Sequence, residues 1–195
     1  SCSTEQLIAA GRLHEQYPGT YIQTHLSENK DEIDSTLSLC PDCQDYLEVY
    51  ERARLVTDRS IFGHCIHLSD SECRRLVEAG SVVAHCPTSN LFLGSGLFDM
   101  QQANRVGMQT VLATDIGAGT SFSMLRTMGE AYKVQQLGGY PMSVFESLYK
   151  CTLGAAKALH LDDEIGCFGK GRKADFIVMD LSLIHISEPT RLGMI

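Results

Sequence analysis

Three ionisable side chains stand where predicted β-strands end: His25, His64 and Asp115. In a parallel barrel the carboxyl ends of the strands meet at one face, and active sites lie there. Neutral imidazoles and a carboxylate that converge at such a face suit a borderline divalent ion such as zinc, with one coordination position left open for water. Taken singly, each residue has a structural alternative, as a hydrogen-bonded histidine or a turn-forming aspartate. Their shared position at strand ends favours the metal site.

Two further residues flank this set. Glu28 follows His25 by three residues on the same loop, close enough to reach a substrate held over a metal. It equally fits a solvated carboxylate in the first turn of a helix. His85 ends a third strand, ahead of a loop rich in hydrogen-bonding groups, where it lines the pocket or fixes the loop. The remaining histidines are predicted to be surface or packing residues: His14, His67, His160 and His185.

The strands that must position these residues are short apolar runs at residues 20–25, 60–64, 81–86 and 109–114. Longer amphipathic stretches separate them, and this alternation predicts βα units with a parallel sheet. The intervals from His25 through His64 and His85 to Asp115 are 39, 21 and 30 residues. They are close to the roughly 30 residues per unit of an eight-unit barrel.

Helix starts have local signals. A capping side chain followed three residues later by Glu occurs in three pairs: Ser69 with Glu72, Asn29 with Glu32, and Ser143 with Glu146. Gly80 is placed to end, in a left-handed conformation, the helix that Ser69 begins. Residues 123–137 read as one long helix, and a further helix runs from residue 143 to about residue 160, with an interruption at Gly154.

Other motifs are weak. Cys40 and Cys43 form a Cys-x-x-Cys without a second pair at zinc-ribbon spacing, so a loop is the better interpretation. Gly117 and Gly119 lack the third glycine of a dinucleotide fingerprint, and the Gly-Lys-Gly at residues 169–171 lacks the rest of a phosphate-binding loop.

Composition narrows the kind of protein. The 195 residues are 44% hydrophobic and 21% charged, which is enough to bury a core. The formal net charge is -8, which argues against nucleic acid or an anionic membrane as the main partner. We see neither a signal peptide nor a long apolar run, and the eight cysteines without secretory context predict reduced thiols in the cytoplasm.

The order of elements predicts an α/β fold: the C-terminal half of a TIM-like (β/α)8 barrel, truncated at its N-terminus. Four strands cannot close an eight-stranded barrel and leave a sheet edge exposed. We expect residues 1–161 to be the C-terminal part of the barrel and residues 162–181 to return to a small β domain, with a strand at 174–179. Residues 182–195 continue no pattern and read as a non-native tail.

Several runs resemble the amidohydrolase superfamily and, within it, the bacterial guanine deaminase family. They are THLSENKDEI (24–33), GHCIHL (63–68), CPTSNLFLGSGL (86–97), ATDIGAG (113–119) and, downstream, IGCFGKGRKADFIV (165–178). The resemblance covers roughly residues 1–180. Its combination of HLSEN with DIGAG is specific to this family.

The resemblance implies roles. His25, His64 and Asp115 match the family's metal ligands on the fifth, sixth and eighth barrel strands, and Glu28 matches the glutamate that passes a proton to the purine ring. With His85, the residues His25, Glu28 and Asp115 are also expected to contact the substrate. The implied reaction is zinc-dependent hydrolysis of guanine to xanthine and ammonia by a homodimer, with iron as the alternative metal.

Two features of the family have no counterpart in the sequence: the first-strand His-x-His pair and the guanine-contacting Arg-Phe pair. The chain alone is therefore expected to be an inactive part of the enzyme. Two alternatives stay open. One is another aminohydrolase or chlorohydrolase of the superfamily, acting on an adenine-derived nucleoside or a triazine. The other is a non-catalytic half-barrel that binds metal loosely or dimerises through its open edge.

Overall fold

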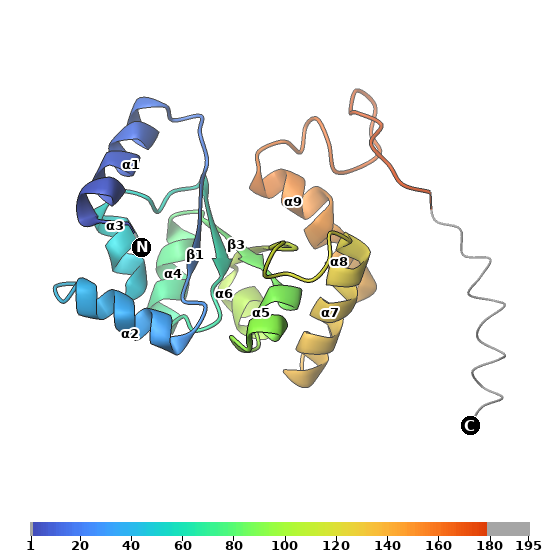
Figure 1. Ribbon diagram of the computed structural model, residues 1–195. Helices are drawn as coiled ribbons and strands as arrows, with labels where there is room; N and C mark the ends of the chain where they lie inside the picture. Colours follow the sequence, from blue (N-terminus) through green and yellow to red (C-terminus); the bar gives the residue numbers. More distant parts are fainter. Residues whose placement is uncertain (1, 179–195) are drawn as a thin grey trace.

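Four parallel strands form the centre of the structure, a computed structural model that describes residues 2–178 (Figure 1). The strands are β1 (Ile22–Leu26), β2 (Ser60–His64), β3 (Val82–His85) and β4 (Gln109–Leu112). They lie in the sheet in chain order, β1-β2-β3-β4, and each neighbouring pair is parallel. All four predicted strands are confirmed, with boundaries that differ by at most two residues.

Helices connect and flank the strands. In chain order they are α1 (Thr4–Gln16), α2 (Lys30–Leu39), α3 (Tyr46–Arg52), α4 (Asp70–Glu78), α5 (Pro87–Leu93), α6 (Met100–Val106), α7 (Met124–Leu137), α8 (Val144–Cys151) and α9 (Leu153–Ala158). In Figure 1, α1, α2 and α3 lie on the β1 side of the sheet, and α7, α8 and α9 lie on the opposite side, beyond β3. No helix in the described part of the chain is long and apolar enough to cross a membrane.

All three predicted N-cap side chains are confirmed, but only one of the three predicted capping boxes forms. Ser69 and Glu72 form a reciprocal capping box at the start of α4. Asn29 caps α2 by accepting from the Glu32 backbone N–H, but the Glu32 carboxylate bonds elsewhere. At α8, Ser143 likewise caps the helix while the Glu146 carboxylate bonds Tyr140 and Asn104 instead.

Two apolar clusters pack against the sheet, one on each face. The larger lies between the sheet and the helices, where Leu26, Phe62, Val83 and Leu112 pack on side chains such as Leu76. Alternate strand residues face the other way, and Val82, Ala84 and Val111 pack there with Ala158 of α9. Because strand side chains alternate between the two faces, both sides of the sheet are partly apolar.

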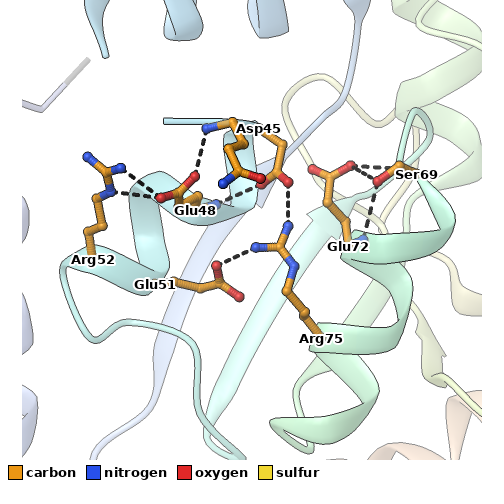
Figure 2. A network of polar contacts seen from close by, with 8 residues as sticks. Asp45, Glu48, Glu51, Arg52, Ser69, Glu72 and Arg75 are labelled. Atoms are coloured by element: carbon orange, nitrogen blue, oxygen red, sulfur yellow. Dashed lines mark hydrogen bonds and ion pairs between the residues drawn. The ribbon is translucent and has the colours of Figure 1, made fainter. Parts of the chain in front are cut away.

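A polar network joins α3 to α4 (Figure 2). The guanidinium of Arg75 donates to Asp45 and to Glu51, each at 2.5 Å. Asp45 is also the N-cap of α3, accepting from the Glu48 backbone N–H. One arginine on α4 therefore fixes both ends of the short helix α3.

Three sequence predictions need revision. The loop predicted after His85 is helical from Pro87, because proline suits the first position of a helix. Residues 174–178 form no strand, since no described strand lies beside them to bond with, and Met179 lies outside the described residues. The helix predicted from residue 143 is divided at Thr152, two residues before the expected interruption. The tail predicted at 182–195 also lies outside the described residues.

Candidate active site at the carboxyl end of the sheet

His25 is the penultimate residue of β1, and its ring is held from one side. The Nδ1–H donates to Glu32 Oε1 at 2.8 Å, while 60% of the side chain is exposed. The hydrogen bond to Glu32 raises the pKa of His25 above its ordinary value, against the opposing effect of partial burial. With Nδ1 engaged in this way, Nε2 is the nitrogen available to a ligand.

His64 ends β2 and is almost fully buried, 5% exposed. Its backbone takes a left-handed conformation (φ 66), which turns the ring toward the carboxylates at the strand ends. The Nδ1–H donates to Asn90 Oδ1 at 2.8 Å. Nε2 lies 3.7 Å from Glu28 Oε2 and 3.8 Å from Asp115 Oδ2. Asn90 thus fixes the ring so that Nε2 faces both carboxylates.

Asp115 lies beyond β4 in a turn that only a few residue types tolerate. Its φ is 48, and aspartate is one of the side chains that adopt this left-handed region readily. The Gly119 N–H donates to the Asp115 carbonyl, and a Cβ at Gly119 would meet the Thr114 carbonyl at 1.7 Å. Glycine at position 119 is therefore required for the tight turn that places Asp115 beside His64.

Glu28 lines a pocket of about 650 Å³ together with Asn29, Lys30, Asp31, His67, Leu93, Gly94 and Ser95. The Ser95 hydroxyl donates to Glu28 Oε1 at 2.9 Å. The ring of His67 donates from Nε2 to the Ser95 carbonyl at 3.0 Å. The carboxylate of Glu28 is consequently held at the junction of this pocket and His64.

The donor set suits a metal ion. Ligand atoms of His64, Cys86 and Asp115 all lie within 4.8 Å of one another. Ligands about 2.0–2.2 Å from a tetrahedral zinc lie roughly 3.4 Å apart, so the 3.8 Å between His64 Nε2 and Asp115 Oδ2 is near that spacing. The ring of His25 is close as well, with its centroid 6.3 Å from that of His64. Imidazole and carboxylate are ligands that zinc accepts.

His85 is buried in the core and does not line the pocket that contains Glu28. It is fully buried, its ring stacks on Phe98 with centroids 4.8 Å apart, and neither ring nitrogen has a hydrogen-bond partner among the described residues. Burial lowers the pKa of His85 to about 3, and nearby Lys150 and His64 act in the same direction. The structure does not bring His85 to the pocket that Glu28 lines.

Sequence reasoning missed several polar residues of this site. Asn90, Ser95 and Glu32 act on His64, Glu28 and His25, and His67, predicted to be a surface or packing residue, lines the pocket. Cys86 also lies near His64, with a pKa that burial raises to about 12. The matching run at residues 86–97 contained Cys86, Asn90 and Ser95, but their individual contacts depend on the fold.

The profile of the Amidohydrolase family matches residues 1–193, and the chain belongs to this family. Guanine deaminase of Escherichia coli (strain K12) is 52% identical over 178 residues, which are 91% of this chain and 40% of that protein. The chain thus spans about 40% of the length of this curated relative.

Solved structures are similar over nearly the whole chain. E. coli guanine deaminase gives a TM-score of 0.92 at 49% identity, covering 96% of this chain and 45% of that one. Guanine deaminase from C. acetobutylicum, solved with guanine in its active site, gives a TM-score of 0.87 at 31% identity, covering 96% of this chain and 46% of that one. An adenosine deaminase from Xanthomonas campestris with bound zinc gives a TM-score of 0.87 at 26% identity, covering 96% of this chain and 43% of that one. These likenesses confirm the predicted α/β fold class.

Proposed function

We propose that this chain is the C-terminal part of the barrel of a guanine deaminase, which hydrolyses guanine to xanthine and ammonia. The observation that carries the proposal is the convergence of two carboxylates on His64 at the carboxyl end of the sheet: Nε2 lies 3.7 Å from Glu28 Oε2 and 3.8 Å from Asp115 Oδ2. The 52% identity to E. coli guanine deaminase supports the choice of substrate.

Zinc is the metal we propose, held by His25 Nε2, His64 Nε2 and the Asp115 carboxylate. When bound at such a site, zinc acts as a Lewis acid and makes water nucleophilic near neutral pH. The neighbour from Xanthomonas campestris with bound zinc supports this choice over iron. The family's first-strand His-x-His pair would complete the ligand set in the whole enzyme.

The chain's own carboxylates move the protons. Asp115 accepts a proton from the water that attacks the purine carbon bearing the amino group. Glu28 protonates the adjacent ring nitrogen, which makes that carbon more electrophilic. As the carbonyl of xanthine forms, the hydroxyl on that carbon gives its proton to Glu28, which returns to its protonated state. Asp115 passes the proton it took from water to the departing amine, so that water and guanine give xanthine and ammonia. Ser95 and His67 keep Glu28 oriented toward the pocket throughout.

We propose the same division of the chain as the sequence predicts: barrel to residue 161 and a return segment over residues 162–181. In the whole enzyme a homodimer is expected. A second candidate function is deamination of an adenine-derived nucleoside, since the adenosine deaminase of Xanthomonas campestris has a TM-score of 0.87.

The test is ammonia release from guanine and from adenosine, each with and without zinc. Two proteins are compared: the 195-residue chain, and a completed form in which this chain follows the N-terminal part of E. coli guanine deaminase, including its His-x-His strand. We expect zinc-dependent release from guanine in the completed form only. Release from adenosine alone would favour the second candidate, and release from neither would favour a non-catalytic half-barrel.

A further inference from the structure

The carboxylate of Glu32 receives hydrogen bonds from three different parts of the chain. Oε1 accepts from His25 Nδ1 at 2.8 Å and from the Tyr46 hydroxyl at 3.0 Å. Oε2 accepts from the Glu28 backbone N–H at 2.9 Å. Only 18% of the Glu32 side chain is exposed. One carboxylate thus joins strand β1, the loop after it and helix α3.

This arrangement is not what local helix capping alone would produce. Glu32 is the third residue of α2, where a capping box would send its carboxylate back to the Asn29 backbone. In α4 the equivalent Glu72 does so, bonding the Ser69 backbone N–H at 2.8 Å. In α2 the carboxylate turns to His25 and Glu28 instead, and only the Asn29 side chain caps the helix. The comparison within one chain indicates that Glu32 serves the site rather than the helix end.

Tyr46 strengthens the arrangement from the opposite side. Its side chain is buried against Tyr50, with ring centroids 5.6 Å apart. Burial raises the pKa of Tyr46 well above its ordinary value, so the phenol keeps its proton and donates. The hydrogen bonds from His25, Glu28 and Tyr46 together outweigh burial and lower the pKa of Glu32, which keeps it an acceptor.

Two consequences follow for the catalytic groups. Because Nδ1 of His25 donates to a carboxylate, the neutral ring is fixed as the Nδ1–H tautomer and the lone pair is on Nε2. Carboxylates placed behind metal-binding imidazoles orient the ring and raise its basicity. The Glu28 backbone is tied to the same carboxylate, so the side chain extends toward His64 from a fixed point.

We propose that Glu32 is a positioning residue that holds His25 ready to bind metal through Nε2 and holds Glu28 in place for proton transfer. The part that concerns Glu28 rests on the proposed deaminase function. The part that concerns His25 depends only on metal binding, and it can be measured without any reaction.

The first measurement uses the 195-residue chain without metal, at pH 9, where imidazoles are neutral. The ¹⁵N chemical shifts of the His25 ring report its tautomer, with the signals assigned by their loss in His25→Gln. We expect the Nδ1–H form in the unmodified chain and a shift toward Nε2–H in Glu32→Gln. Asp34→Asn is the matched control, because it removes an exposed carboxylate of the same helix, and its His25 signals should not change.

The second measurement is zinc affinity by competition with a chromogenic chelator, followed by kinetics in the completed form. We expect Glu32→Gln to weaken zinc binding by about 10–100-fold, as is typical when a carboxylate behind a metal-bound histidine is lost. At saturating zinc, kcat should remain reduced because Glu28 has lost its backbone anchor. Glu32→Asp keeps the charge and should recover part of both losses.

The outcomes separate the two proposals. If the completed form does not deaminate guanine but Glu32→Gln still changes the His25 tautomer and zinc affinity, the proposed substrate is wrong and the positioning role stands. If deamination occurs and Glu32→Gln matches Asp34→Asn in tautomer and zinc affinity, the positioning role is wrong. Should Glu32→Gln not fold, Glu32→Asp decides, because unchanged tautomer and affinity in that folded variant would overturn the proposal.

Discussion

The Ser95 hydroxyl donates to Glu28 Oε1 across 67 residues of sequence, at 2.9 Å. Gly94 makes this contact possible, because its left-handed conformation (φ 70) ends α5 and turns the chain back toward the strand ends. Ser95 is itself buried, and its carbonyl accepts a hydrogen bond from the ring of His67. The loop after α5 therefore orients the carboxylate that we propose transfers a proton to the ring.

Replacing Ser95 by alanine should lower kcat in the completed form. A hydrogen bond to a charged group contributes about 1.5–3 kcal/mol, so we expect a loss of about 10–100-fold if the contact persists in the transition state. Steady-state ammonia release measures it. Ser35→Ala on the exposed side of α2 is the control and should behave as the unmodified enzyme. An unchanged kcat would mean that Ser95 does not orient Glu28.

Glu28→Gln should act mainly on turnover. The amide keeps the shape of the side chain and its contact with Ser95 but cannot transfer a proton to the ring nitrogen. General acid catalysis contributes about 10²–10⁴-fold, and kcat should fall by a factor in that range. Comparing kcat with KM distinguishes the roles, since an effect confined to KM would show that Glu28 only positions the substrate.

Asp115→Asn tests the second proton carrier with little disturbance of the backbone. Asparagine tolerates the positive φ of 48 at this position, whereas alanine adopts it at a cost. The variant loses both the charge and the proton acceptor, so deamination in the completed form should become undetectable while circular dichroism is unchanged. Near-normal turnover would refute the assigned role. Asp115→Ala should be equally inactive and somewhat less stable.

Arg75→Met should destabilise the fold more than removal of an exposed arginine. Arg75 pairs with Asp45 and Glu51 together (Figure 2), and all three side chains are partly buried, 25–29% exposed. We expect a loss of about 1–2 kcal/mol in the free energy of unfolding, because two carboxylates lose their shared partner. Arg52→Ala, which breaks a more exposed pair within α3, should cost less than about 0.5 kcal/mol. Urea denaturation measures both, and equal losses would contradict the special role of Arg75.

The strands and most helix starts were predictable from local sequence. Apolar runs bounded by polar stretches located β1 to β4, and side chains such as Ser69 and Asn29 marked helix starts because their caps form within one turn. The division at Thr152 was only approximately predictable. It depends on the packing of Tyr149 against Gly154, where a Cβ would come within 2.7 Å of the Tyr149 carbonyl.

The site was predictable only in part, for a similar reason. His25, His64 and Asp115 could be placed at one edge because parallel strands end together. Glu32 could not be assigned, since its spacing from Asn29 predicts a capping box and only the folded chain brings Tyr46 and His25 to its carboxylate. Ser95 and Asn90 reach Glu28 and His64 across 67 and 26 residues, distances at which sequence periodicity carries no information.

His85 should make the fold sensitive to acid. Its pKa is about 3 when folded, against an ordinary value of 6.5, because burial disfavours the charged ring and Lys150 and His64 add to that effect. Between these two values the unfolded chain binds a proton that the folded chain does not. The stability that depends on neutral His85 is therefore complete above pH 6.5 and declines as the pH falls toward 3.

His85→Leu removes this dependence, together with two buried nitrogens that have no partner among the described residues. From pH 7 to pH 5, the unmodified chain should lose about 2 kcal/mol more of its free energy of unfolding than the variant, since each pH unit below 6.5 costs about 1.4 kcal/mol. Urea denaturation at the two pH values measures the difference. At pH 7 the variant should be at least as stable, because an unpaired buried polar group costs about 1–3 kcal/mol. Equal acid sensitivity in the two proteins would mean that the His85 ring takes up its proton in the folded state, and that its burial beside Lys150 and His64 does not keep it neutral.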